Sequence, residues 1–226
     1  MTASPPEPWV EAWLSTPRFG VYLTAAAGDR QLALDLYEWN ATVSAAFQHD
    51  MAHLEVALRN AYDAALTAGT PAGHPHWTLD ATRLFPVVWR TAQDGTRIDS
   101  NRTPRDQVDR AVREAGPGAP AGKVIAELSF GFWRYLSTSA HHHPLWIPYL
   151  HKAFTPGISR QTVDRPVGRL HKLRNRVAHL EPLLRQNLAG RHDDVLIVAG
   201  LISAELRDYI AGTSEAPAII GRRPVP

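Results

Sequence analysis

Three residues in the C-terminal third of the chain have side chains suited to phosphodiester chemistry. Arg174, Asn175 and His179 lie within a basic stretch that ends at Pro182. Arginine carries a permanent planar cation that fits a phosphate, and histidine transfers protons near neutral pH. Together they are sufficient to cut RNA without a metal ion. The same residues also occur at the end of an ordinary basic helix. Evidence from the rest of the chain is therefore needed to choose between a cleavage site and a purely structural helix end.

The spacing of these residues determines what one copy of the site can do. On an α-helix Asn175 and His179 are i and i+4 neighbours, whereas Arg174 and His179 point about 140° apart. In-line cleavage of RNA requires a base for the 2′-hydroxyl and an acid for the leaving 5′-oxygen. A single histidine would have to act first as the base and then as the acid, whereas two copies facing across a twofold axis supply two histidines. We therefore predict a homodimer.

These side chains are predicted to project from one basic helix, from Ser159 to about Arg185. Its apolar residues recur at spacings of three and four, as in a helix with one buried side. They are Leu170, Leu173, Val177, Leu180 and Leu184. His179 lies off this stripe, so its side chain is expected to be accessible. His171 is one turn before Asn175, and we leave open whether it is a third polar group of the cleft or a surface residue.

The segment from Ser159 to Arg191 is strongly basic in a chain whose net charge is only +2. It holds eight Lys or Arg residues against two carboxylates, a net charge of +6. A basic patch on a mildly acidic body is typical of proteins that bind a polyanion, although a solvated helix face gives the same count. We predict that Arg169, Lys172 and Arg176 bind RNA phosphates outside the cleaved bond.

The amino-acid composition excludes several other kinds of functional site. The chain has 226 residues and no cysteine, which excludes disulfides, a thiol nucleophile and Cys-ligated metal sites. No signal-peptide pattern and no membrane-length apolar run is found, so we expect a cytoplasmic protein. The consecutive histidines 141–143 rarely present three nitrogens to one ion, and we expect no metal and no cofactor.

Helical periodicity dominates the chain and predicts an all-α fold, an irregular helical bundle. We expect an N-terminal arm over residues 1–20, a single helical domain over 21–212 and a flexible tail over 213–226. Residues 69–103 are rich in Pro, Gly and Trp, which predicts a loop-rich insertion in that domain.

Apolar spacing and stop signals place the individual helices. Residues 29–68 form two long helices, or one with a break near His49 to Met51, and end at Gly69. Further helices are expected over about 103–115, 123–136 and 193–211.

Two further clusters each have a structural and a functional interpretation. Glu55 and Arg59 are i and i+4 neighbours, which favours a stabilising ion pair over a wall of the catalytic cleft. The aromatic run from Phe130 to Trp133 can stack bases, but such runs more often form core, with Gly131 allowing a close helix approach. We favour the structural interpretation for both clusters.

Four blocks of sequence, taken in order, resemble the abortive-infection (Abi-like, AbiD/AbiF type) branch of the HEPN superfamily. The motif from Arg174 to His179 is similar to the arginine-x4–6-histidine signature of HEPN proteins, with the polar residue directly after the arginine. The blocks lie within roughly residues 30–210, at 54–60, 128–133, 145–148 and 173–182.

The resemblance implies an HEPN-type fold, dimerisation through the motif helices and metal-independent endoribonuclease activity in phage defence or a toxin–antitoxin system. Carried onto this chain, Arg174 would contact the scissile phosphate and His179 would be the general acid and base. Asn175 would orient His179 or the phosphate. Many family members carry a second histidine where this chain has Leu180, a position that the chemistry does not require.

The same resemblance adds support residues and partners. The block that contains Glu55 and Arg59 would contribute a wall of the cleft, and His171 is a further candidate for it. An antitoxin protein or RNA is expected to restrain such an enzyme. The alternative is a non-catalytic HEPN domain that binds RNA or a partner protein without cutting.

Overall fold

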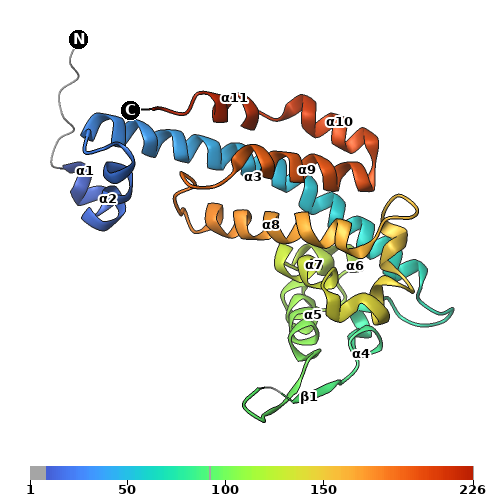
Figure 1. The fold of residues 1–226 in the computed structure, drawn as a ribbon. Coiled ribbons are helices and arrows are strands. Elements are labelled where there is room, and N and C mark those ends of the chain that lie inside the picture. Colours follow the sequence, from blue (N-terminus) through green and yellow to red (C-terminus); the bar gives the residue numbers. More distant parts are fainter. Residues whose placement is uncertain (1–8, 92, 226) are drawn as a thin grey trace.

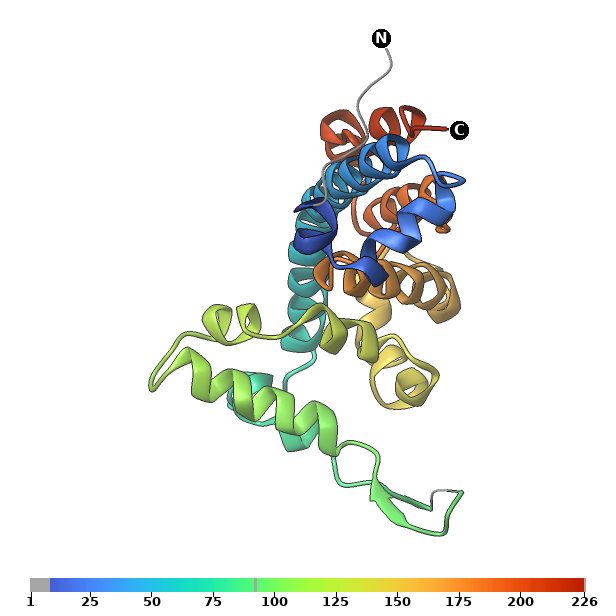
Figure 2. The ribbon, with the colours of Figure 1, turned by 90° about the vertical axis from the view of Figure 1, so that its left-hand side faces the viewer.

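The computed structural model describes residues 9–91 and 93–225, and they are mostly helical (Figure 1). The prediction of an all-α fold is confirmed at this level. Within the described ranges the sheet content is one short two-stranded hairpin. Figure 2 shows that the hairpin and the green helix that follows it extend away from the body formed by the other helices.

One long helix, α3 (Arg30–Ala68), runs through the molecule and contacts elements from both ends of the chain. Asp29 caps its first turn by accepting a backbone N–H, and Gly69 follows its last residue, so the predicted end is confirmed. The helix has no break between His49 and Met51. Neither Gly nor Pro interrupts the segment, and its apolar positions stay on one buried side throughout.

The N-terminal segment packs on the first half of α3. It forms α1 (Trp9–Leu14) and α2 (Thr16–Ala25), in which Val10 and Phe19 are fully buried. Residues 1–8 of the predicted arm lie outside the described residues. The remainder of that arm is therefore part of the packed body.

Part of the predicted flexible tail is also helical. Residues 216–221 form α11 (Ala216–Gly221), and Ala216 is fully buried. The indole Nε1 of Trp39 donates to the Ile219 carbonyl oxygen at 2.8 Å. This short helix is stabilised by burial of Ala216 and Ile219. The Pro- and Arg-rich residues at the end of the sequence led to the incorrect prediction of a flexible tail.

Three helices complete the body beside α3. They are α8 (Arg160–Ala178), α9 (Leu188–Ile202) and α10 (Ala204–Thr213). The single helix predicted over 193–211 is thus two helices. Ser203 adopts an extended backbone between them, and its hydroxyl caps α10 by accepting from the Leu206 N–H.

The predicted insertion contains more structure than expected. It holds η1 (Trp77–Leu79), α4 (Ala81–Leu84) and a hairpin of β1 (Trp89–Thr91) and antiparallel β2 (Arg97–Asp99). The helix α5 (Arg102–Ala115) follows directly. Trp77 is fully buried, so the insertion contributes to the core rather than lying on it as a loose loop.

The helix predicted over 123–136 is two helices, α6 (Ala121–Ala126) and α7 (Phe130–Leu136). Ser129 has an extended backbone that separates them. Phe130, Phe132 and Trp133 are all fully buried, which confirms the structural interpretation of the aromatic run. Three short helical turns then lead to α8: η2 (Ser139–His141), η3 (His142–Trp146) and η4 (Leu150–Ala153).

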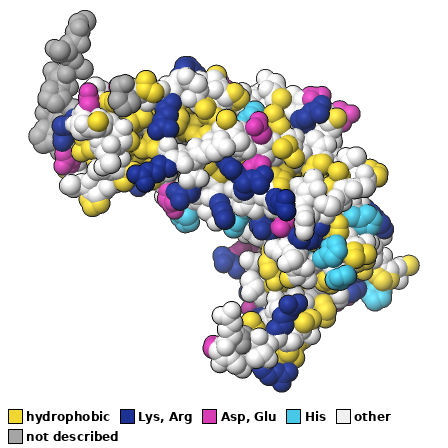
Figure 3. Space-filling view, viewed as in Figure 1, with side chains coloured by type: hydrophobic (Ala, Val, Ile, Leu, Met, Phe, Trp, Pro, Cys, Tyr) yellow, Lys and Arg dark blue, Asp and Glu magenta, His cyan; other side chains and the backbone are white. Residues whose placement is uncertain are grey.

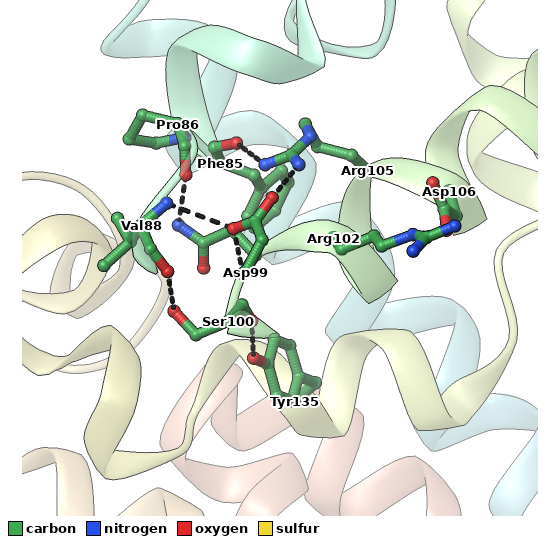
Figure 4. A network of polar contacts seen from close by, with 10 residues as sticks. Phe85, Pro86, Val88, Asp99, Ser100, Arg102, Arg105, Asp106 and Tyr135 are labelled. Atoms are coloured by element: carbon green, nitrogen blue, oxygen red, sulfur yellow. Dashed lines mark hydrogen bonds and ion pairs between the residues drawn. The ribbon is translucent and has the colours of Figure 1, made fainter. Parts of the chain in front are cut away.

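A polar network fixes the base of the hairpin (Figure 4). The Asp99 carboxylate accepts from the Val88 N–H at 3.1 Å and from the Arg105 guanidinium. The Tyr135 hydroxyl donates to the Ser100 carbonyl oxygen at 3.0 Å. Because these contacts join the hairpin to both α5 and α7, its direction is set by the body of the protein.

Two apolar clusters form the core, one at each half of α3. The larger joins the second half to α5, α6, α7, α9 and the start of α8; the smaller joins the first half to α1, α2, α11 and the end of α8. The helix α8 therefore crosses both clusters, with Leu170 in one and Leu173 in the other. Among the described residues, no helix combines the length and the apolar character needed to cross a membrane.

Candidate nucleic-acid interface and active site

The helix that carries the motif begins as predicted and ends early. Ser159 caps α8 by accepting from the Thr162 N–H at 3.2 Å. The last helical residue is Ala178, seven residues before the predicted end at Arg185, and His179 is the C-terminal cap. Leu180, assigned to the buried stripe from its spacing, is 65% exposed. The predicted helix end and the position of Leu180 are therefore wrong.

A Schellman turn ends α8. The Leu180 N–H donates to the Val177 carbonyl at 3.0 Å, and the Glu181 N–H donates to the Arg176 carbonyl at 2.8 Å. Leu180 occupies the left-handed position that glycine usually takes, with φ of 55°. The turn leads the chain away from the helix axis and leaves the His179 side chain exposed.

Arg174 lies in the wall of a groove between α3 and α8, with a volume of about 200 Å³. We call it the α3–α8 groove. Its lining is mostly apolar and comes from two turns of each helix: Phe47, Gln48, Met51, Ala52, Glu55, Leu173, Arg174, Val177 and Ala178. The two charged residues of this lining, Arg174 and Glu55, come from different helices and carry opposite charges.

Burial raises the pKa of the Glu55 carboxyl above its usual value, and the cations of Arg174 and Arg59 and the backbone amide of Phe130 partly oppose this. Glu55 of α3 and Arg174 of α8 therefore line the same groove. The ion pair favoured between Glu55 and Arg59 is not formed within 4 Å in the described chain, and the Arg59 Nε is buried without a hydrogen-bond partner there.

The Asn175 amide lies beside His171, not beside His179. Its Nδ2 is 3.4 Å from the His171 Nε2. The His171 ring stacks on Phe130 with centroids 6.1 Å apart, and a Cβ at Gly131 would lie 3.3 Å from the His171 Nε2. Burial, with help from the Arg134 and Arg174 cations, lowers the pKa of His171. A neutral His171 can accept from the Asn175 amide, a pairing that the sequence analysis did not predict.

In the described hydrogen bonds, His179 contacts Asn175 through its backbone only. The His179 N–H donates to the Asn175 carbonyl oxygen at 2.9 Å. Its exposed imidazole directly follows Ala178, which lines the α3–α8 groove together with Arg174. Arg174 therefore lines the groove, whereas His179 directly follows the last lining residue of α8 and is not itself one of the described lining residues.

The three residues predicted to bind RNA phosphates have different surroundings. Arg169 forms a bidentate ion pair with the buried Asp194 of α9, which ties the guanidinium to the fold although the Arg169 side chain is 44% exposed. Arg176 pairs with Glu181 at 3.0 Å. Lys172 is exposed and makes no ion pair within the described part of the chain.

Ion pairs reduce the free positive charge of the basic segment. Four of its eight cations contact carboxylates, at Arg160, Arg169, Arg176 and Arg191. The other four make no ion pair among the residues described: Arg165, Lys172, Arg174 and Arg185. Figure 3 shows that Lys and Arg side chains still gather over α8 and its surroundings on this face of the molecule.

The histidines at 141–143 form no metal centre in the described residues, where no group of three or more potential ligands has suitable geometry. His141 is buried between the rings of Phe85 and Tyr135. Burial lowers the pKa of His141 to about 4, with a smaller effect from Arg90. This residue is part of the core.

Compared with known proteins, the chain matches no family model, no curated protein and no solved structure. A proposal about its family therefore depends on the sequence resemblance, and a proposal about its function on the chemistry of the site.

Proposed function

We propose that this protein is a metal-independent endoribonuclease of the abortive-infection or toxin type, with an HEPN-type fold. The observation that supports this most directly is the end of α8. There the Schellman turn exposes His179 immediately after Ala178, while Arg174 lies in the wall of the same groove. A permanent cation in the groove wall and an exposed group that transfers protons thus lie close together in sequence at the end of one helix.

The reaction that fits these groups is transesterification of the phosphodiester by the neighbouring 2′-hydroxyl. His179 removes the proton from a ribose 2′-hydroxyl, and the 2′-oxygen forms a bond to phosphorus. The bond from phosphorus to the 5′-oxygen breaks, and that oxygen takes up a proton from the protonated His179 of a second copy of the chain. The products are a 2′,3′-cyclic phosphate and a 5′-hydroxyl. Arg174 stabilises the charge that gathers on the phosphate oxygens, and the adjacent Glu55 helps to orient the Arg174 guanidinium.

A second copy of the chain would complete the site. One chain offers His179 on one side of the scissile bond, whereas in-line cleavage uses a base and an acid on opposite sides. The exposed Ala52 and Ala178 on the rim of the α3–α8 groove allow another α8 to approach closely. We therefore propose a homodimer through the motif helix, with RNA as substrate and an antitoxin protein or RNA as a restraint.

One observation favours a second function, a non-catalytic domain that binds RNA or a partner protein. The Asn175 amide pairs with His171, so it does not orient the His179 imidazole. A histidine without this support is a weaker catalyst, although RNA can still bind beside it.

The experiment measures single-turnover cleavage of RNA by the wild type, Arg174→Ala, His179→Ala and the control His143→Ala. Loss of general acid–base catalysis lowers the rate by roughly 10²–10⁴-fold for His179→Ala. His143 is exposed and distant in sequence, so its variant should retain the wild-type rate. Wild-type cleavage by His179→Ala contradicts the proposal. RNA binding without cleavage by every protein supports the second function.

A further inference from the structure

A second and larger hollow lies on the other side of the last turn of α8. Its volume is about 810 Å³, and it lies between α2 and the loop that joins α8 to α9. Its polar lining consists of Arg176, Arg185 and Arg223, with Thr24 and Gln186. We call it the arginine hollow. Arg174 and Arg176 are two residues apart and therefore point about 160° apart on the helix, toward separate hollows.

We propose that the arginine hollow binds the phosphodiester backbone of a single RNA strand next to the cleaved bond; this rests on the proposed function. Three guanidinium groups reach it from three segments, at the end of α8, in the following loop and after α11. In the described parts of the chain its lining includes no Asp or Glu. Converging cations in a lining without carboxylates are suited to a chain of phosphates.

Arg223 is held in position before any ligand binds. Its Nη1 donates to the Leu184 carbonyl oxygen at 2.9 Å, and its Cζ lies 5.3 Å from the centroid of the Trp39 ring. A guanidinium has five N–H donors, so this contact leaves others for a phosphate. Fixing the side chain in advance lowers the entropy lost on binding.

The loop that carries Arg185 is fixed as well. The Leu183 N–H donates to the Oδ1 of the buried Asn40 at 2.7 Å, and Arg18 donates to the Leu180 carbonyl oxygen. Leu183 is fully buried, while Arg185 is exposed. The buried anchors hold the loop, so Arg185 is presented at the hollow without ordering a flexible segment.

Arg176 has an exchangeable partner. Its ion pair with Glu181 spans 3.0 Å, and the two side chains are 41% and 47% exposed. Such surface pairs contribute little to stability, so a phosphate can replace the Glu181 carboxylate at small cost.

The order of residues along the chain connects the two hollows. Ala178 lines the α3–α8 groove, Pro182 lines the arginine hollow, and His179 lies between them. A strand that crosses the end of α8 therefore places one phosphate near Arg174 and His179 and neighbouring phosphates in the arginine hollow.

The experiment uses a fluorescent single-stranded oligoribonucleotide with 2′-O-methyl groups throughout, which cannot be cleaved through its 2′-oxygens. Binding is measured over a range of salt concentrations for the wild type, Arg185→Ala and Arg185→Glu. Arg113→Glu, an exposed arginine of α5 without an ion pair in the described chain, is the matched charge control. Thermal unfolding of each variant checks the fold.

Arg185→Glu should weaken binding by about tenfold, the loss expected for one charge-assisted hydrogen bond, while Arg113→Glu matches the wild type. Arg185→Ala should reduce the slope of log K against log salt by about 0.7, one phosphate contact to a single strand. Equal losses for Arg185→Glu and Arg113→Glu would overturn the proposal. So would displacement of the oligoribonucleotide by inorganic phosphate at equal phosphate concentration, because the hollow would then recognise free anion.

Binding by the Arg185 variants and cleavage by the wild type test the strand site and the endoribonuclease activity separately. Loss of binding in the Arg185 variants, with no cleavage of natural RNA by the wild type, keeps the strand site and rejects the endoribonuclease. Cleavage by the wild type with unchanged binding by the Arg185 variants rejects the strand site alone.

Discussion

At the scale of single residues, the exposure of His179 depends on the backbone of its neighbour. Leu180 holds a left-handed conformation, with φ of 55°, in the position that glycine usually takes in a Schellman turn. A side chain with a Cβ is strained there. Because Leu180 is 65% exposed, burial of its own side chain offsets little of that strain. The strain lies directly beside the proposed catalytic histidine, where strained backbone often occurs.

Replacing this leucine tests the strain. Leu180→Gly should raise the free energy of unfolding by about 1 kcal/mol, because glycine adopts the left-handed conformation without a Cβ clash. Urea unfolding of the wild type and the variant measures the difference. Leu180→Ala retains the Cβ and serves as control, with no gain expected. A glycine variant no more stable than the alanine variant would show that the turn is unstrained.

The buried His141 makes stability depend on pH. Its pKa is lowered to about 4 by burial, below the usual value of 6.5, so on acidification the unfolded chain takes up a proton before the folded chain does. Stability from this group is therefore complete above pH 6.5 and is lost as the pH falls toward 4. From pH 7 to pH 5 the loss should be about 2 kcal/mol.

His141→Phe removes this titration and preserves an aromatic ring between Phe85 and Tyr135. The variant should lose about 2 kcal/mol less than the wild type over the same pH interval, measured by denaturant unfolding at both pH values. His143→Gln, which changes an exposed histidine, should follow the wild type. Parallel losses in wild type and His141→Phe would mean that His141 titrates normally.

At the scale of elements, α8 and α9 are joined through one buried acid. Asp194 is 3% exposed and accepts from Arg169 of α8 and from Arg191 of α9, the latter at 2.6 Å. Removing a buried carboxylate leaves its cations without compensation, which costs more than breaking a surface pair. The position of α8, and with it the groove, depends on this contact.

Asp194→Ala should therefore destabilise the fold by about 3 kcal/mol. Arg169→Ala should cost less, because Arg191 still compensates the carboxylate. Glu114→Ala breaks the exposed pair with Arg110 on α5 and should change stability by at most about 0.5 kcal/mol. Urea unfolding compares the three variants, and a cost for Asp194→Ala no larger than for Glu114→Ala would contradict a buried link.

Some helix ends could be predicted from the sequence and others could not. The ends of α3 at Asp29 and Gly69 and the start of α8 at Ser159 follow from capping residues and were predictable. The end of α8 was not, because Leu180 takes a glycine position and carries no stop signal. The same error kept His179 inside the predicted helix and so paired it with Asn175 by i,i+4 spacing. In the structure His179 is the helix cap, and the Asn175 amide lies beside His171.

At the scale of the whole molecule, the shape is set by α3, which carries two apolar clusters, and by a hairpin anchored on α5 and α7. The hairpin and the division of the core depend on contacts between distant segments, such as Tyr135 with Ser100. Local sequence patterns do not contain these contacts. The all-α character was predictable because it follows from local periodicity.

The proposed cleavage site requires two copies of the chain. Light scattering should give twice the chain mass of 25.0 kDa for the wild type. Ala52→Glu places a charge on the exposed rim of the α3–α8 groove and should give a 25.0 kDa monomer with loss of cleavage. Ala64→Glu, on an exposed part of α3 outside this groove, should remain a dimer. A monomeric wild type that cleaves RNA would contradict a shared site.

Metal-independent cleavage by His179 is tested most directly by the end-group chemistry of RNA incubated with the purified protein in EDTA. We expect fragments that end in a 2′,3′-cyclic phosphate and begin with a 5′-hydroxyl, and no such fragments with His179→Ala. Intact RNA with the wild type, or fragments that His179→Ala forms equally well, would contradict it.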